Sequence, residues 1–229
     1  MTTPVWQEIA LADRVVRVRV HRPSTARRDD LPLVLHVHGG GFVGTAVQCD
    51  WVNSNLAARL PALVVSVEHR LLAPGTPLTA AVDDGWDVLD DVVRHATRWG
   101  VDAARVAVFG ESTGAVITAL AAIKARESGL ELRAQVLINA CVDLTSTVYD
   151  HASMTRYADS PTLTRAQMEL FLRLAVPEGT DPRPLSPLCT PTTWARWPRR
   201  SSSCRPSTRW PTTGARTHNA CKRPGRLPV

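Results

Sequence analysis

The sequence predicts an α/β fold, in which helices cover both faces of a mostly parallel β-sheet. Short runs rich in β-branched residues alternate with longer stretches of helical periodicity, which is the element order of a parallel sheet. Several of these runs are apolar at consecutive positions, as in strands that are buried on both faces. A chain of 229 residues that is 44% hydrophobic can form one core of moderate size.

The expected strands come first. The segment 15–23 alternates apolar and charged residues with a period of two, which is typical of a half-buried strand. Short apolar runs, most of them rich in β-branched residues, predict further strands. These runs are 31–41, 60–70, 104–112 and 132–142.

Helices are expected between these strands. One is marked by apolar residues that recur at spacings of four and three between aspartates, and a second by the alanine-rich segment 113–129. From about 145 to 175 the pattern is again amphipathic, with a threonine N-cap at 162 or 164, which predicts cap-like helices. The apolar positions of the first helix are Val82, Trp86, Leu89 and Val93.

The segment AVFGESTGAV at 107–116 places Ser112 in a G-x-S-x-G pattern. The pattern alone is weak, because turns of small residues are common. Here a buried strand ends just before it and a helix begins just after it, which is the setting of a nucleophile elbow. Such a turn exposes the serine at the carboxyl edge of the sheet, next to the positive end of the helix dipole. A plain serine N-cap is the weaker interpretation.

A second motif, HGGGF at 38–42, follows another expected strand. Consecutive glycines let a backbone approach a ligand closely and turn its N–H groups toward it. Acyl-transfer enzymes need such donors where a carbonyl oxygen becomes an oxyanion. A merely flexible glycine loop is the alternative, and the serine motif downstream argues against it.

Together, HGGGF and GESTGA resemble the motifs of the hormone-sensitive-lipase-like branch of the α/β-hydrolases, a group of bacterial carboxylesterases. The resemblance extends over about residues 31–188 and implies an α/β-hydrolase fold. It also implies ester hydrolysis through a serine and an acyl-enzyme, without metal or cofactor. The chain departs from the family pattern at Glu111, Thr113, Ala115 and His69, and the N-terminal cap of the family is mostly absent.

The resemblance also implies residue roles. Ser112 would be the nucleophile, and His38 would shape the glycine loop rather than act as the base. The other residues with implied roles are Gly39, Gly40 and Thr113 for the oxyanion hole, Gly41 for the shape of the loop, and Gly110 and Gly114 for the turn.

The acid and the base are not assigned by the sequence. In this fold they follow the nucleophile in the order acid, then histidine. Only His151 and His218 follow Ser112; His151 fits a surface residue near the cap-like helices, and His218 lies in the C-terminal tail. Asp143 ends an expected strand, where the fold can host an acid, but the family's residue there is structural.

The tail differs in composition from the rest of the chain. Residues 190–229 hold nine of the 27 basic residues and none of the 21 acidic ones, with little aliphatic content. We therefore expect a hydrolase domain at 1–188 and a disordered tail at 189–229. Binding of the tail to nucleic acid or membrane is one interpretation. Translation in the wrong reading frame is the one that we favour.

The frame hypothesis can be examined from the codons. Abundant Ala, Arg, Val and Pro predict a gene with G or C at most third positions. The last base of each codon can then be joined to the first two of the next. Residues 190–214 can in this way read ADDLGALAPALVVVPAVDPLADDG, an apolar strand before a segment that resembles the family's acid motif. One base missing near codons 188–190 would produce this shift, and the late strands of the sheet would be lost.

Other features bound the function. The five cysteines are scattered without metal-ligand spacing, and the sequence predicts neither a secretory signal nor a membrane span. We expect a cytoplasmic protein whose partner is a small-molecule ester, with no nucleic acid and no membrane; a homodimer is compatible with the sequence. Three functions stay open: an active esterase on short-acyl esters, an inactive remnant of one, and a ligand-binding protein on the same fold.

Overall fold

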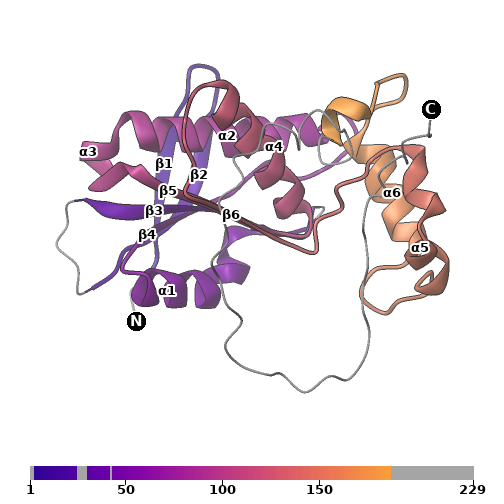
Figure 1. The fold of residues 1–229 in the computed structure, drawn as a ribbon, viewed down its shortest axis with the longest axis horizontal. Coiled ribbons are helices and arrows are strands. Elements are labelled where there is room, and N and C mark those ends of the chain that lie inside the picture. The colour runs from indigo at the N-terminus through magenta and orange to yellow at the C-terminus, as the bar shows by residue number, and fades with distance from the viewer. Residues whose placement is uncertain (1–2, 25–29, 42, 187–229) are drawn as a thin grey trace, which may run out of the picture. The chain divides into compact units, whose positions relative to one another are not determined.

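The computed structural model describes residues 3–24, 30–41 and 43–186, all within one unit, Met1–Arg196. The tail expected at 189–229 lies outside the described residues. The described part forms one six-stranded sheet in the order β1-β2-β4-β3-β5-β6 (Figure 1). The strands are β1 Val5–Ala10, β2 Val15–His21, β3 Leu31–Val37, β4 Leu63–Val67, β5 Val101–Glu111 and β6 Ala134–Ile138.

The sheet is mostly parallel, as the sequence predicts. β4, β3, β5 and β6 run parallel to one another, whereas β1 and β2 form an antiparallel pair and β2 is antiparallel to β4. β4 is buried along its whole length and β3 at six of its seven residues, which explains their continuous apolar sequence. The carboxyl ends of β3 and β5 therefore meet at one edge of the sheet.

Helices lie on both faces of the sheet (Figure 1). α2 and α4 pack against each other over the larger core cluster, while α1 borders a second cluster that includes Val34, Val64 and Phe109. The helices are α1 Asp50–Arg59, α2 Leu78–Arg94, α3 Ala96–Trp99, α4 Thr113–Glu127, α5 Ala152–Arg156 and α6 Arg165–Ala175, with 3-10 turns η1 Ala46–Cys49, η2 Ser146–Asp150 and η3 Arg183–Leu185.

Several elements differ from the sequence-based expectation. β1 and α1 were not foreseen, and the strand expected at 132–142 is only five residues long. In α2 the buried stripe runs through Leu78, Val82, Val88, Leu89 and Val92, so Trp86 and Val93 lie at its margin. The cap-like segment contains short helices, and α6 begins at the capping box of Thr164 and Gln167. No helix of the described part is long and apolar enough to span a membrane.

Candidate active site

Ser112 occupies a strained turn between β5 and α4. Its backbone has φ 52° and ψ −122°, a conformation that residues other than glycine rarely adopt. Its N–H donates a 2.8 Å hydrogen bond to the carbonyl of Ile138 at the end of β6. Strain of this kind persists only where surrounding structure holds it in place, and it concentrates at functional sites.

Two glycines make this turn possible. A Cβ on Gly114 would lie 2.2 Å from the carbonyl oxygen of Val37, and one on Gly110 would lie 2.4 Å from the carbonyl oxygen of Gly114. Both contacts are with backbone atoms, which cannot move aside as a flexible side chain can. The first turn of α4 therefore packs directly against the end of β3.

The glycine loop that follows β3 lies against the same turn. A Cβ on Gly39 would be 3.3 Å from the Cβ of Ser112, and one on Gly41 would be 2.8 Å from the Thr113 hydroxyl. Gly40 has φ 77°, in the left-handed region that favours glycine. The two motifs, more than sixty residues apart in the sequence, are thus adjacent in the fold.

The loop and the helix start supply backbone donors. The N–H groups of Gly39, Gly40 and Thr113 form no hydrogen bond with another described residue. For Thr113 this is the ordinary condition of the first turn of a helix, which has no intrahelical acceptor. Free N–H groups near a serine hydroxyl can stabilise negative charge on a carbonyl oxygen that the serine attacks.

His38 is buried and braces the glycine loop. Its Nδ1 donates to the Gly39 carbonyl at 2.8 Å, and its ring stacks on His69 with a centroid distance of 4.2 Å. Burial, reinforced by His69, lowers the pKa of His38 to about 4. A neutral His38 with Nδ1 protonated fits the loop-shaping role that the resemblance implies. The stacked His69 was noted in the sequence only as a departure from the family pattern.

Cys49 and Glu111 form a contact beside the turn that the sequence did not suggest. The Cys49 thiol donates to Glu111 Oε1 at 3.3 Å. Burial, with the added effect of the Glu111 carboxylate, raises the pKa of this thiol to about 12. Cys49 therefore stays protonated near neutral pH and is no rival nucleophile.

None of the histidines of the described part forms a hydrogen bond with the Ser112 hydroxyl. His36 bonds Ser66 at 2.8 Å inside the core, and burial lowers its pKa to about 3. His151 is half exposed, as expected, and its Nε2 lies 3.5 Å from Asp143 Oδ2. His218 lies outside the described residues. The described part thus contains no histidine that forms a hydrogen bond with the Ser112 hydroxyl and could act as its base.

Asp143 has surroundings that hold it as a carboxylate. It is buried and accepts hydrogen bonds from the N–H and hydroxyl of Thr145 and from the hydroxyl of Thr147. Burial raises its pKa, but these hydrogen bonds outweigh that effect and lower the pKa below its usual value. The sequence does not pair Asp143 with His151, but the closely spaced Thr145 and Thr147 are a sign in the sequence that this carboxylate accepts hydrogen bonds.

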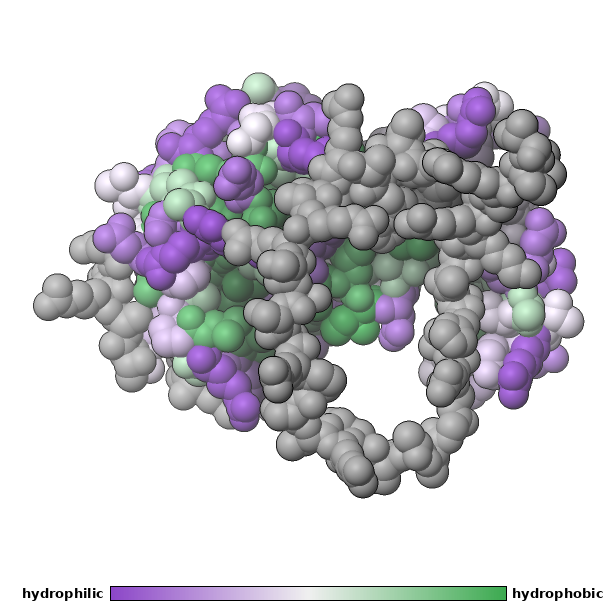
Figure 2. All heavy atoms as spheres, in the orientation of Figure 1, coloured by the Kyte–Doolittle hydropathy of each residue, from purple (hydrophilic) through white to green (hydrophobic). Residues whose placement is uncertain are grey.

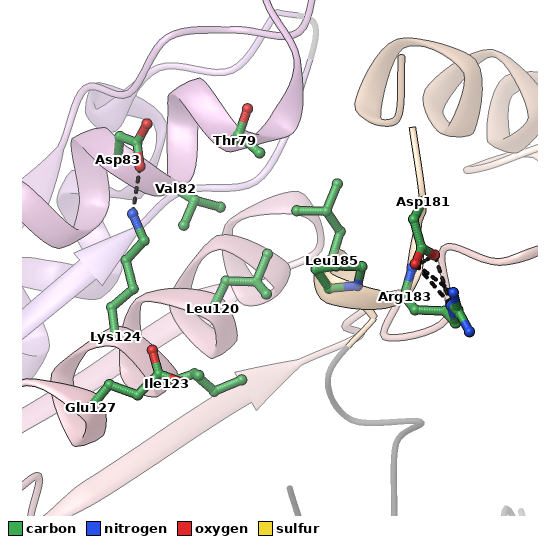
Figure 3. Close-up of a pocket in the computed structure, with 11 residues that line it drawn as sticks. Thr79, Val82, Asp83, Leu120, Ile123, Lys124, Glu127, Asp181, Arg183 and Leu185 are labelled. Carbon is green, nitrogen blue, oxygen red and sulfur yellow. Dashed lines mark hydrogen bonds and ion pairs between the residues drawn. The ribbon is translucent and has the colours of Figure 1, made fainter. Parts of the chain in front are cut away.

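One cavity of the described part lies away from Ser112. It has a volume of about 520 Å³ and lies between α2, the second half of α4 and residues 181–185 (Figure 3). Val82, Leu120 and Leu185 give it an apolar floor, with the Lys124–Asp83 ion pair to one side. Leu120 is eight residues along α4 from Ser112, or about 12 Å at the rise of an α-helix. No cluster of potential metal ligands occurs among the described residues.

A family model described as an alpha/beta hydrolase fold matches residues 34–203. The chain belongs to the α/β-hydrolase family. The carboxylesterase NlhH of Mycobacterium tuberculosis is 38% identical over 169 residues, which are 72% of this chain and 51% of that protein. The arylesterase of Saccharolobus solfataricus is 31% identical over 153 residues, covering 66% of this chain and 47% of that protein.

Solved structures agree with this assignment. The hyperthermophilic esterase from the archaeon Pyrobaculum calidifontis superposes with a TM-score of 0.74 at 34% identity, over 81% of this chain and 61% of its own. These similarities confirm the resemblance to the hormone-sensitive-lipase-like carboxylesterases. The chain spans about half the length of the first curated relatives that it matches.

Proposed function

We propose that this chain is a carboxylic ester hydrolase in which Ser112 attacks small esters with short acyl groups. The observation that carries the proposal is the contact between the strained Ser112 turn and the glycine loop, where Gly39 lies against the serine side chain. Nucleophile and backbone donors are then within reach of one bound carbonyl group. The esterases among the relatives support the same reaction class.

The proposed reaction proceeds through an acyl-enzyme. The Ser112 oxygen forms a bond to the ester carbonyl carbon and gives its proton to a base. The carbonyl oxygen takes up the negative charge and accepts hydrogen bonds from the N–H groups of Gly39, Gly40 and Thr113. The alcohol leaves with a proton, and water then releases the acid. Metal ions and cofactors have no part in these steps.

The test is covalent labelling with a fluorophosphonate, whose phosphorus bonds to an activated serine as fluoride leaves. With imidazole added as an external base, we expect mass spectrometry to find the label on the peptide that contains Ser112. Ser112→Ala should abolish the label, whereas Ser128→Ala, at the exposed end of the same helix, should not change it. Label on another residue, or equal labelling of Ser112→Ala, would contradict the assignment of the nucleophile.

A second candidate function has an observation in its favour. No described histidine forms a hydrogen bond with the Ser112 hydroxyl, so the chain resembles an esterase that has lost its base, or a ligand-binding protein on the same fold. Either alternative predicts a correctly folded chain that the fluorophosphonate does not label. Added imidazole, which can act as an external base, distinguishes the esterase that has lost only its base from the ligand-binding protein. Imidazole should speed labelling only if the nucleophile and the oxyanion hole are intact.

A further inference from the structure

The 3-10 turn η1 contacts both motifs of the candidate site. Gln48 Nε2 donates a 3.2 Å hydrogen bond to the carbonyl of Gly39 in the glycine loop. The next residue, Cys49, donates its thiol hydrogen to Glu111, which directly precedes Ser112. Hydrophobic residues gather over the sheet in Figure 2, whereas η1 contacts the two motifs through these polar groups. Two adjacent residues of one turn thus connect the glycine loop with the serine turn.

η1 is itself anchored to the sheet. Glu68, directly after β4, accepts hydrogen bonds from the Ala46 N–H at 2.6 Å and from the Thr45 hydroxyl at 3.2 Å. Thr45 and Gln48 form a capping box, in which the Thr45 N–H donates to Gln48 Oε1 at 3.3 Å. A capping box needs only the side-chain oxygen, so glutamate serves as well as glutamine. The nitrogen of Gln48 therefore has a contact that the capping box does not require.

The Gly39 carbonyl accepts two hydrogen bonds, from His38 Nδ1 at 2.8 Å and from Gln48 Nε2 at 3.2 Å. A peptide unit is planar and trans, so the Gly40 N–H lies on the opposite edge of the same plane and points away from the Gly39 carbonyl. Glycines allow such a peptide to turn unless its polar groups are held. Holding the carbonyl therefore fixes the direction of the Gly40 N–H, which forms no hydrogen bond with another described residue.

We infer that Gln48 is a positioning residue for the proposed oxyanion hole: through the Gly39 carbonyl, it sets the direction of the Gly40 N–H. The role of that N–H rests on the proposed function, whereas the orientation of the peptide does not. A donor that already points at the developing charge stabilises it without reorganisation during the reaction. Loss of the Gln48 contact should therefore slow bond formation at Ser112 more than it weakens binding of the reagent.

Gln48→Glu separates this role from a merely structural one. The new side chain keeps the oxygen that accepts from the Thr45 N–H, but an ionised carboxylate has no hydrogen to donate to the Gly39 carbonyl. We expect an unchanged thermal midpoint, because the capping box is kept. The rate constant of fluorophosphonate labelling of Ser112 at saturating reagent, with imidazole added, should fall about tenfold or more, and the half-saturating concentration should change by less than about threefold.

Three further variants serve as comparisons. Gln48→Met has a similar length and no charge, so slow labelling in this variant as well would exclude the added charge as the cause. Gln167 forms the same kind of capping box with Thr164 at the start of α6, is exposed, and has a side-chain nitrogen that donates to no other described residue. Gln167→Glu and Gln167→Met should therefore leave the labelling of Ser112 unchanged.

A second measurement needs no reactivity. In NMR spectra of the isotope-labelled chain, the Gly39 carbonyl carbon should move upfield in both Gln48 variants, because the carbonyl loses a donor, and should stay in place in both Gln167 variants. An unmoved Gly39 signal overturns the inference.

The labelling experiment has outcomes of its own. Labelling of the Gln48 variants at the rate of the unaltered chain overturns the inference. So does a thermal midpoint that falls together with the labelling in Gln48→Glu, because Gln48 would then only stabilise η1. If the unaltered chain is not labelled even with imidazole, the proposed function fails, and the Gly39 signal alone decides whether Gln48 orients the peptide.

Discussion

At the scale of single residues, the turn at Ser112 depends on the absence of side chains at Gly110 and Gly114. A serine at φ 52° carries a conformational cost on the order of 1–3 kcal/mol, which the packing of α4 against β3 must offset. That packing is close because Gly110 and Gly114 have no side chains. The position of the Ser112 side chain therefore depends on these two glycines as much as on the serine.

Gly114→Ala tests this dependence. The new methyl group would lie 2.2 Å from the Val37 carbonyl oxygen, so the helix start must move. We expect the free energy of unfolding to fall by about 3 kcal/mol or more, at the upper end of overpacking effects. Gly179→Ala is the matched control: it has open space and φ 77°, so only the left-handed backbone costs it about 1–2 kcal/mol. If urea unfolding gave equal losses of unfolding free energy for the two variants, the close approach of Gly114 to Val37 would not be the cause of the loss.

His36 gives a residue-scale prediction about pH. Burial lowers its folded-state pKa to about 3, against about 6.5 when unfolded, so below pH 6.5 the unfolded chain binds more protons. Its contribution to stability is complete above pH 6.5 and is lost as pH falls toward 3, by up to about 1.4 kcal/mol per pH unit. His36→Leu should remove this slope. The check is urea unfolding of both chains between pH 7.5 and 5, where parallel curves would contradict the prediction.

At the scale of elements, Asp84 of α2 connects three segments. Its buried carboxylate accepts hydrogen bonds from Arg14 at 2.9 Å, ahead of β2, and from the Arg70 N–H and guanidinium at 2.8 to 3.2 Å, after β4. The sequence placed aspartates between apolar residues of this helix but did not single out the buried one. Helical periodicity identifies a face, whereas the partners of a buried carboxylate come from distant segments.

Asp84→Asn should therefore lower the free energy of unfolding more than the same substitution at an exposed aspartate of α2 does. Removing one partner of a buried ion pair costs about 3–5 kcal/mol, and we expect about 3 here because Arg70 is half exposed. Asp90→Asn, which loses only the exposed pair with Arg94, should change the free energy of unfolding by less than about 1 kcal/mol. Thermal or urea unfolding of the two variants measures the difference. Similar losses would mean that the Asp84 network adds no stability.

The elements that the sequence predicted are those with a strong local pattern. β3, β4 and β5 were found because buried strands are apolar at consecutive positions, and α4 because its sequence is rich in alanine. α1 was missed because it buries Asn53 and Ser54, which bond His36 and His21 instead of forming an apolar stripe. The glycine loop and serine turn were likewise readable, since each is local. The His38–His69 stack and the Asp143–His151 pair are tertiary contacts between segments, which sequence spacing does not reveal.

At the scale of the whole molecule, the described part contains Ser112 and the glycine loop of the proposed esterase site. Ser112 follows β5 and the glycine loop follows β3, which are interior strands of the sheet, whereas β6 is the edge strand next to β5 among the described residues. The curated relatives are about twice as long as the segment that they share with this chain. In the fold's order of nucleophile, acid and histidine, an acid and a base would follow Ser112 in the sequence.

The activity of the 229-residue chain follows from this arrangement. Without a base beside Ser112, the chain should hydrolyse 4-nitrophenyl acetate little better than its own Ser112→Ala variant, because backbone donors and binding alone give about 10³–10⁴ over water in triad knockouts. A second chain has the reading frame shifted by one base near codons 188–190 and is extended to the length of a complete relative. In that chain, Ser112→Ala should lower turnover by roughly 10⁶-fold. Steady-state rates of the four chains provide the check. Brisk turnover by the 229-residue chain that depends on Ser112 would show that a base is already present, and His151→Ala, compared with His95→Ala as a surface control, would then tell whether His151 is that base.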